Sequence, residues 1–362
     1  MTKVLDLINI LEAWAPPCLA CDWDPVGLQV GSRNMKVSNI GLALDVDRQT
    51  LAVAKQKKIH LIISQHPLIF KHFSSIDYDH PRQAVLAEVI RSRMSVYSGH
   101  TAFDACAEGT NTQLARYLAI DLATIRPLIT TYCEPLCKVV TFVAHTHVDR
   151  VRAAMGNAGA GHVGNYSHCS FSTSGLGTFM PLKGAHPFIG STGTLEKVEE
   201  TRIEIVVPKL RLAPVLAAMK AAHPYEEVAH DVYPMDVVIK KWGVGFVGEF
   251  LDDKRDVAVQ RLYGDLQKKF SRGIWKGAPL GRRKIKRVAV LGGSGGSEVL
   301  AAIRAKADLY ITGDITHHHD LLARDGGLPI LDIGHTFGER LMLKALKGHL
   351  KREFPKEKIH LL

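Results

Sequence analysis

The sequence predicts an α/β protein with an additional α+β domain inserted into it. Apolar runs typical of strands alternate with helical patterns in residues 1–134 and again in residues 237–362. Between them, residues 135–236 contain two strand–helix repeats separated by a long loop. The outer alternation is typical of βαβ units, and the two repeats are typical of a ferredoxin-like split βαβ module. We therefore predict two α/β halves that form one core with mixed sheets, plus an inserted ferredoxin-like domain.

The N-terminal half, residues 1–134, shows the βαβ order in its first hundred residues. A strand is expected near Asn39–Asp45, a helix near Arg48–Lys57 and a buried strand over Ile59–Ser64. Pro67 follows the second strand and limits its length, because proline cannot donate to the ladder of a central strand. This order of strand, helix and strand predicts an open sheet with parallel neighbours.

The inserted domain, residues 135–236, is expected to follow a junction at Thr130–Pro135. Its two strand–helix pairs are predicted over Val139–Ala144 with Val148–Gly156, and over Arg202–Val207 with Leu212–Ala222. Two segments that contain histidines, Gly161–Cys169 and Ala222–Glu227, allow either metal binding or simple turn formation. We favour a structural or lid-like role for both segments.

The C-terminal half, residues 237–362, resumes the alternation of strands and helices. Strands are predicted over Val288–Leu291, Leu309–Asp314 and Leu328–Leu331, and a helix is predicted after His335. The glycine-rich segment Gly292–Ser297 joins the first of these strands to a helix. Such a turn can cradle a phosphate group at the helix N-terminus, but it lacks the Walker spacing, and close packing of two chain segments explains the glycines as well.

Three of the predicted strands are followed by a histidine. His66, His100 and His335 occupy these positions, and Asp104 and Glu339 each follow one of the histidines by four residues. Residues four apart lie on the same face of a helix. Because sites in open α/β sheets form at the carboxyl ends of strands, we expect these side chains to form one metal or catalytic site. Asp314, at the end of another strand, is a candidate to orient a ligand imidazole.

Four motifs together resemble one protein family. They are Trp23–Gly31, Gln65–Phe70, His100–Asp104 and Asp332–Glu339, and they occur in that family's order between about Leu5 and His360. The family is the GTP cyclohydrolase I type 2-like family, also called the Ngg-interacting-factor-three-like family. The resemblance implies a dinuclear metal site and a homohexamer. It also implies an insertion similar to copper-tolerance and nitrogen-regulatory signalling proteins.

The resemblance further implies which residues bind the two divalent metal ions of each subunit. His66, Asp104 and Glu339 would bind one ion, and His335 with a bridging Glu339 would bind the other. Gln65 stands where the family has a histidine. An amide oxygen replaces imidazole poorly on a transition metal but suits harder cations, so the second site is expected to be weaker. His100 and His318 are candidates to supplement it.

Two divalent ions about 3.5–4 Å apart can activate a bridging water for hydrolysis. We therefore predict a metal-dependent hydrolase that acts on a nucleotide-like small molecule, with His100 as general acid or base. The alternative is a metal-binding regulatory or metal-handling protein without turnover, which the insertion and Gln65 both favour. A third hypothesis is a scaffold that binds single-stranded nucleic acid through its basic residues.

Composition places the chain among ordinary globular proteins. It has 362 residues, of which 46% are hydrophobic and 23% are charged. No apolar run approaches the roughly 20 residues that span a bilayer, and the N-terminus lacks the profile of a signal peptide. We therefore expect a cytoplasmic protein with no membrane partner. The six cysteines form no recognisable disulfide framework, and the Cys18-x-x-Cys21 motif lacks the strand before it that a redox motif requires.

The net charge of +10 is unevenly distributed. Residues 1–236 contain 22 Lys and Arg and 22 Asp and Glu, so the whole excess lies in residues 237–362. The densest basic segment is Arg282–Arg287. No aromatic residues interleave with these charges as they do in single-strand binding surfaces. We therefore interpret the basic residues as a solvated surface and do not expect a nucleic-acid partner.

Overall fold

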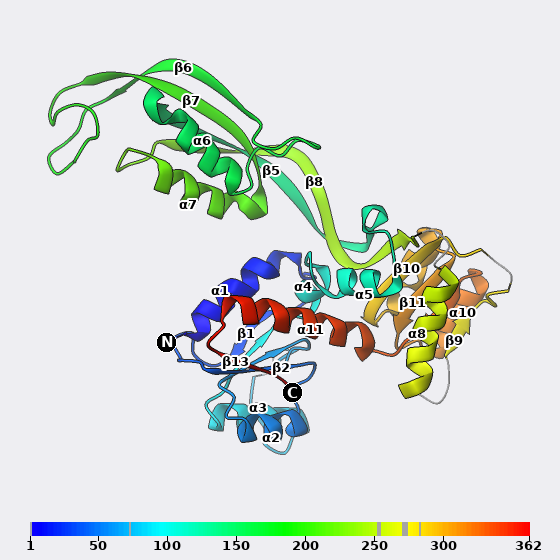
Figure 1. Cartoon of the computed structure of the whole chain (residues 1–362). Coiled ribbons are helices and arrows are strands. Elements are labelled where there is room, and N and C mark those ends of the chain that lie inside the picture. The colour runs from blue at the N-terminus through cyan, green and yellow to red at the C-terminus, as the bar shows by residue number, and fades with distance from the viewer. Residues whose placement is uncertain (1, 72–73, 252–254, 270–273, 282–283) are drawn as a thin grey trace. The chain divides into compact units, whose positions relative to one another are not determined.

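The computed structural model describes residues 2–71, 74–251, 255–269, 274–281 and 284–362. These residues form two compact units (Figure 1). Unit 1 comprises Met1–Tyr132 and Trp242–Leu362, and unit 2 comprises Cys133–Lys241. Arg282 and Arg283 of the predicted basic segment lie outside the described residues.

The N-terminal half of unit 1 contains a five-stranded sheet. In spatial order its strands are β1 (Gly27–Val30), β4 (Ser95–Ser98), β3 (Leu61–Ser64), β2 (Asn39–Ala43) and β13 (Lys358–Leu361). The pair β1–β4 is antiparallel and the other pairs are parallel. The outermost strand β13 comes from the end of the chain, a long-range pairing that the sequence pattern did not predict.

Helices cover both faces of this sheet. On one face lie α2 (Arg48–Gln56) and α3 (Pro81–Arg91), and on the other lie α1 (Val4–Trp14) and α11 (Thr336–Glu353) (Figure 1). Helix α2 begins where predicted, because the Asp47 side chain accepts a hydrogen bond of 2.7 Å from the Thr50 amide. The apolar strand β3 is fully buried, as expected for a strand covered on both faces.

A second sheet contributes five strands to the C-terminal half of unit 1. In spatial order they are the end of β8 (His230–Glu249), then β10 (Arg287–Ser294), β11 (Leu309–Gly313), β12 (Pro329–Asp332) and β9 (Trp275–Gly277). The strands β10, β11 and β12 are parallel, whereas β8 and β9 run antiparallel to their neighbours. The associated helices are α8 (Arg255–Lys269), α9 (Val299–Arg304) and α10 (His317–Asp325). Both sheets are mixed, which confirms the predicted α/β class.

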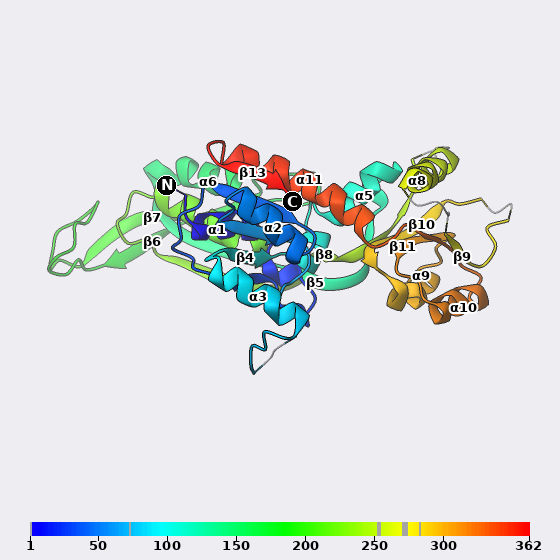
Figure 2. The same ribbon diagram turned by 90° about the horizontal axis from the view of Figure 1, so that it is seen from below.

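Helices α4 (His100–Ala105), α5 (Thr110–Leu118) and α11 connect the two halves of unit 1. Leu114 and Leu118 of α5 share a buried apolar cluster with Val290 of β10 and Ile311 of β11. Helix α11 packs against β10 and also against β2 and β13 of the first sheet (Figure 2). The strand ends of the two halves therefore lie close together, although the halves are separated in sequence.

Unit 2 contains two helices and four strand segments. Its elements are β5 (Arg126–Ala144), α6 (Val148–Asn157), β6 (Ser170–Phe179), β7 (Glu196–Pro208), α7 (Leu212–Ala222) and the first part of β8. Strand β7 pairs antiparallel with both β5 and β6. The boundary between the units falls between Tyr132 and Cys133, inside the predicted junction at Thr130–Pro135. The chain crosses this boundary within the continuous strand β5. The polar residues of this segment reflect a partly exposed strand rather than a loop.

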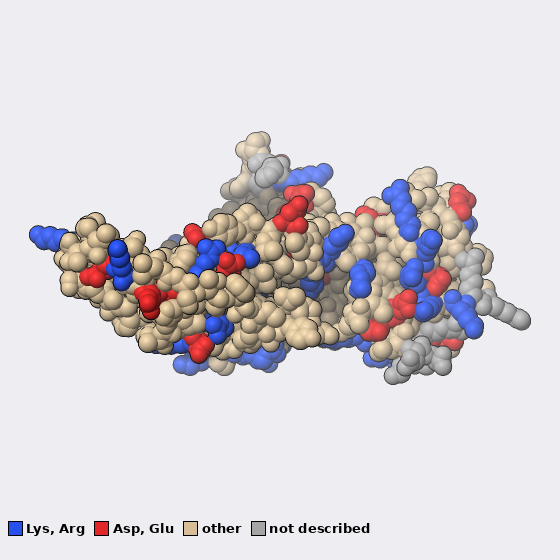
Figure 3. Space-filling view, turned by 90° about the horizontal axis from the view of Figure 1, so that it is seen from above, with Lys and Arg blue, Asp and Glu red and all other residues tan. Residues whose placement is uncertain are grey.

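Short 3-10 helices complete the secondary structure that the structure describes. They are η1 (Pro17–Leu19), η2 (Leu122–Thr124), η3 (His145–His147), η4 (Lys209–Arg211) and η6 (Gly296–Glu298). No helix in the described ranges is long and apolar enough to cross a membrane. None of the six cysteines, all of which are described, forms a disulfide bond. On the face drawn in Figure 3, lysines and arginines are interspersed with acidic side chains.

The stability of unit 2 is expected to decrease in acid because of His223. The neutral ring donates through Nε2 to the Phe142 carbonyl (3.1 Å) and accepts at Nδ1 from the Tyr225 amide (3.2 Å). Burial lowers the pKa of His223 below its value in the unfolded chain. The stabilisation is therefore complete above about pH 6.5 and is lost as the pH falls through the lowered folded-state value.

We expect His223→Leu to reduce the free energy of unfolding by about 1–3 kcal/mol at pH 7.5, because two backbone groups lose their partner. The variant should also show a flatter decline in stability from pH 7.5 to pH 5. Denaturant unfolding of the full chain at several pH values measures both effects. Parallel pH profiles for variant and wild type would exclude this role.

Candidate metal site

Three side chains of unit 1 place their ligand atoms within 4.8 Å of one another: His66, His335 and Glu339. The Nε2 atoms of the two histidines are 2.9 Å apart. Glu339 Oε1 lies 3.1 Å from His66 Nε2 and 3.4 Å from His335 Nε2. The three atoms thus form a compact triangle.

The local chain geometry places these residues. After β3 the backbone continues to pair, since the Gln65 and His66 amides donate to the Ala43 and Leu44 carbonyls. After β12, Gly334 adopts a positive φ of 71° and donates its amide to Asp332 Oδ1, which turns the chain into α11. His335 stands at the start of α11, and Glu339 follows one turn later on the same face.

Each of the two imidazoles makes a hydrogen bond through Nδ1 to a carboxylate. His66 Nδ1 lies 3.0 Å from Asp45 Oδ1, and His335 Nδ1 lies 2.6 Å from Asp314 Oδ2. With Nδ1–H donated to the carboxylate, the Nε2 atom of each ring is directed into the triangle. Histidine ligands of metals are commonly oriented in this way. The sequence suggested that Asp314 orients a ligand imidazole, and the structure places Asp314 against His335.

The charge state of His66 indicates a deficit of positive charge around the Glu339 carboxylate. Burial disfavours the protonated ring, but hydrogen bonds to Asp45 and Glu339 outweigh burial and raise the pKa of His66 to about 10. Without a cation, this histidine therefore retains a proton that partly neutralises Glu339. A divalent cation would supply that positive charge and release the proton.

Gln65 and Asp104 form a hydrogen-bonded, oxygen-rich pair. Gln65 is fully buried and donates through Nε2 to Asp104 Oδ1 (3.0 Å) and to the His100 carbonyl (3.4 Å). Its Oε1 atom and Glu339 Oε2 are buried without a hydrogen-bond partner. Burial, and then the charge of Glu339, raise the pKa of Asp104 to about 6. Buried acceptors without donors require an explanation, and a bound cation provides one.

These residues fit a divalent cation. Nitrogen and oxygen ligands lie about 2.0–2.2 Å from such an ion, so two adjacent ligands are separated by about 2.8–3.5 Å. The separations of 2.9, 3.1 and 3.4 Å among His66, His335 and Glu339 fall in this range. The structure therefore contains one possible His, His and Glu metal-binding group.

The glycine-rich segment after β10 packs against this group. Gly293 has a φ of 82°, and a Cβ atom there would lie 3.1 Å from Glu339 Oε1. A Cβ atom on Gly292 would approach Thr110 Cγ2 to 2.6 Å. The following helix α9 has only six residues and is preceded by a 3-10 turn. Close packing against the site therefore accounts for the glycines, and nothing in the described segment favours the phosphate cradle.

His100 is a third histidine backed by a carboxylate. Its Nδ1 lies 2.9 Å from Asp24 Oδ1, and Asp24 also accepts hydrogen bonds from the backbone amide and the hydroxyl of Thr101. The His100 ring is 5.8 Å from the His66 ring. Both His100 and Asp314 have positive φ angles, of 30° and 58°. Backbone strain of this kind persists where tertiary contacts enforce it, often at functional sites.

Two exposed aromatic residues lie beside His100. Trp23 is 61% exposed and Phe70 is 50% exposed. The two ring centroids are 5.8 Å apart and lie 5.9 Å and 6.3 Å, respectively, from the His100 ring. Sequence reasoning included both residues in motifs but assigned neither a role. The same reasoning missed Asp24 and Asp45, although Asp45 follows a strand adjacent to the one that precedes His66.

His318 is not brought to this group. It lies exposed on α10, and within the described residues no contact joins it to His66, His335 or Glu339. The adjacent His319 side chain instead belongs to the N-terminal cap of α10. A role for His318 in supplementing the second metal therefore has no support from the geometry.

Comparison with known proteins gives consistent results across the chain. The sequence model of the family described as Duf34/NIF3 (NGG1p interacting factor 3) matches residues 2–362. The GTP cyclohydrolase 1 type 2 homolog of Bacillus subtilis (strain 168) is 38% identical over 358 residues, covering 95% of this chain and 91% of that protein. Its namesake in Halalkalibacterium halodurans is 37% identical over 360 residues, with coverages of 96% and 91%.

The fold comparison gives the same result. The crystal structure of a Bacillus cereus protein related to NIF3 matches with a TM-score of 0.83 and 35% identity. The match covers 100% of this chain and 96% of that one. These similarities confirm the family that the four motifs predicted.

Removing the carboxylates behind the imidazoles is expected to weaken metal binding. Asp45→Asn and Asp314→Asn should each lower the affinity for Zn²⁺ or Mn²⁺ by about 10–100-fold. Asparagine preserves the size of both side chains and tolerates the positive φ at position 314. Competition with a chromophoric chelator measures the affinity. Asp325→Asn, an exposed position on α10, is the matched control, and unchanged affinity in both variants would contradict the assignment.

Proposed function

The chain belongs to the Duf34/NIF3 family, and from this premise we propose that it is a hydrolase that uses two divalent cations to attack a nucleotide-like substrate. One observation carries the proposal: Oε1 of the buried Glu339 carboxylate lies against two carboxylate-backed imidazoles, and its Oε2 is buried without a hydrogen-bond partner among the described residues. A carboxylate that faces two sets of ligands can bridge two ions.

The donor atoms divide into two sets. His66 Nε2, His335 Nε2 and Glu339 Oε1 would bind the first cation. Gln65 Oε1, Asp104 and Glu339 Oε2 would bind the second, which accounts for both buried acceptors that lack partners. The second set consists of oxygens alone and therefore suits a harder ion such as Mn²⁺ or Mg²⁺. When bound, the cations would act as Lewis acids that lower the pKa of a coordinated water and polarise the substrate.

His100 is the group best placed to transfer a proton. Its Nδ1–H is fixed by Asp24, whose side chain is fully buried. The Nε2 atom makes no hydrogen bond within the described part of the chain. A histidine oriented in this way can give a proton to a leaving group or take one from water. Asp24 then acts as a positioning residue.

The substrate class follows from the aromatic side chains beside His100. Trp23 and Phe70 expose large apolar rings next to polar catalytic groups. Stacking of a nucleobase on such rings contributes about 1–3 kcal/mol. The name of the relatives, GTP cyclohydrolase 1 type 2 homolog, makes GTP the first compound to test. Purine opening would release formate, whereas phosphoester cleavage would release phosphate.

The central test combines metal content with turnover. We expect about two equivalents of metal per chain by elemental mass spectrometry, and release of formate or phosphate from GTP or of phosphate from p-nitrophenyl phosphate. Glu339→Gln should lose metal and reduce turnover by at least about 100-fold while its circular dichroism is unchanged. Glu353→Gln, an exposed position on the same helix, is the control. Full turnover in Glu339→Gln would exclude the proposal.

A second candidate function is metal binding for regulation or metal handling, without turnover. The observation that favours it is the neutral Gln65 amide in a position where the resemblance implies an imidazole ligand. The variant Gln65→His separates the two functions. One metal equivalent in the wild type that becomes two only in this variant, with no turnover in the wild type, would support the second candidate.

Two further substitutions distinguish binding from chemistry. His100→Gln should lower kcat by about 100–10,000-fold with metal content unchanged, because it removes proton transfer alone. Trp23→Ala should raise KM for a base-containing substrate by about 5–100-fold with little effect on kcat, because it removes stacking. His318→Gln and Trp275→Ala are matched controls outside the site. Equal effects of Trp23→Ala on substrates with and without a base would contradict the stacking role.

A further inference from the structure

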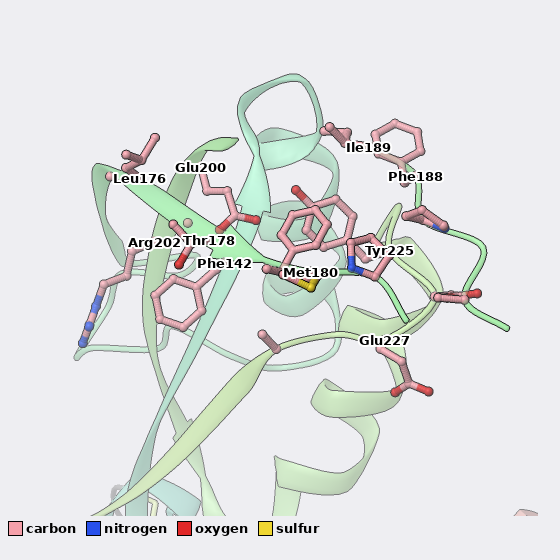
Figure 4. A pocket seen from close by; sticks show the side chains of 18 of the residues that line it. Phe142, Leu176, Thr178, Met180, Phe188, Ile189, Glu200, Arg202, Tyr225 and Glu227 are labelled. Carbon is pink, nitrogen blue, oxygen red and sulfur yellow. The ribbon is translucent and has the colours of Figure 1, made fainter. Parts of the chain in front are cut away.

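Unit 2 contains a pocket of about 660 Å³. Small-molecule sites commonly have volumes of about 300–1,000 Å³. The pocket is lined by β6, by the segment 180–189, by β7 and by residues 225–229 that follow α7 (Figure 4). None of the residues of the candidate metal site lines it. The pocket is therefore a separate feature with the size of a ligand site.

The walls of the pocket are largely apolar and aromatic. Phe142, Phe188 and Tyr225 contribute rings, and the Phe188 and Tyr225 centroids are 6.1 Å apart. Leu176 and Met180 also line the pocket and are 63% and 49% exposed. Such exposure of large apolar side chains around one hollow is typical of a surface that binds a ligand.

Two polar side chains point toward one another in this apolar surrounding. Figure 4 shows the Glu200 carboxylate and the Tyr225 hydroxyl directed into the same part of the pocket. The hydroxyl is buried, and it lies near the Glu200 carboxylate without forming a well-aligned hydrogen bond with any described residue. Burial, and then Glu200, raise the pKa of Tyr225, so the phenol remains neutral at physiological pH. A few convergent polar groups in an apolar pocket are the usual means of orienting a ligand.

The charges that line the pocket favour a cation. Three carboxylates, those of Glu200, Glu226 and Glu227, are present with one guanidinium, that of Arg202. Arg202 already donates through Nε to Glu204 Oε1 (2.9 Å) and lies over the Phe142 ring. Within the part of the chain that the structure describes, Glu200 forms no ion pair. Its negative charge is therefore available to a ligand.

We propose that this pocket binds an organic cation, in which an ammonium group faces Glu200 and Tyr225 and an aromatic body packs against Phe142, Phe188 and Met180. A carboxylate beside aromatic faces is a suitable environment for an ammonium group, since the carboxylate and the electron-rich ring faces both attract it. The apolar body gains from burial against side chains that are exposed in the free protein. This site is independent of the metal centre and of its proposed hydrolytic role.

The test uses three probes of similar shape and different charge. They are 2-phenylethylamine, which is protonated at pH 7, the neutral 2-phenylethanol and the anionic 3-phenylpropanoate. Isothermal titration calorimetry on the full chain is expected to show that the amine binds at least 10-fold more tightly than the alcohol. The anion should bind more weakly than both. Equal affinities of amine and alcohol, or no binding of the amine, would overturn the proposal.

Variants locate the binding and exclude an indirect effect. Glu200→Gln should lower the affinity for the amine at least 10-fold and leave the affinity for the alcohol unchanged. Phe188→Ala should lower the affinity for both probes. The matched control is Glu199→Gln, because adjacent residues of a strand face opposite sides and Glu199 does not line the pocket. Metal content should remain unchanged in all three variants. Undiminished amine binding by Glu200→Gln would overturn the assignment.

A second copy of the chain could cover the same surface, and one measurement distinguishes this case. Sedimentation velocity is recorded over a dilution series with and without 2-phenylethylamine. The proposal expects the amine affinity to be independent of protein concentration. Amine binding that appears only after the chain dissociates would identify another copy as the occupant and would overturn the proposal.

Discussion

The buried carboxylate of Glu339 is the group on which the site depends. Only 3% of this residue is exposed, and only its Oε1 atom contacts the two imidazoles. A buried carboxylate is costly unless positive charge or donors compensate it. Protonated His66 supplies part of the compensation, and Glu339 Oε2 receives none from the described residues. A divalent cation would supply the positive charge that is still missing.

The fold serves to bring this carboxylate to its partners. Helix α11 carries Glu339 from the C-terminal half of unit 1 and packs against strands of both sheets. His66, Gln65 and Asp104 come from the N-terminal half. The apolar cluster between α5 and the second sheet holds the two halves of unit 1 together. Neither half contains all three residues of the candidate metal-binding group, so a bound metal and the packing of the halves would stabilise one another.

The two donor sets around Glu339 differ in chemistry. The set with His66 and His335 presents nitrogen ligands that carboxylates orient from behind. The set with Gln65 and Asp104 presents oxygens, because the Gln65 amide nitrogen already donates a hydrogen bond to Asp104. Histidine sites select borderline transition metals, whereas oxygen sites suit harder ions with less stringent geometry. In the proposed two-cation site, this asymmetry would make Gln65 the residue that decides which ion the second position accepts.

The sequence by itself determined the strands that end in histidines, the helical spacing of His335 and Glu339, and the family. These features depend on local periodicity and on motifs of fewer than ten residues, which survive without knowledge of the fold. Only the tertiary structure decided that Asp45 and Asp24 hold imidazoles and that the Gln65 amide turns its donor to Asp104. Each of these contacts joins residues more than 20 positions apart. These contacts depend on strand register and on the packing of distant chain segments against one another. A local sequence pattern contains neither kind of information.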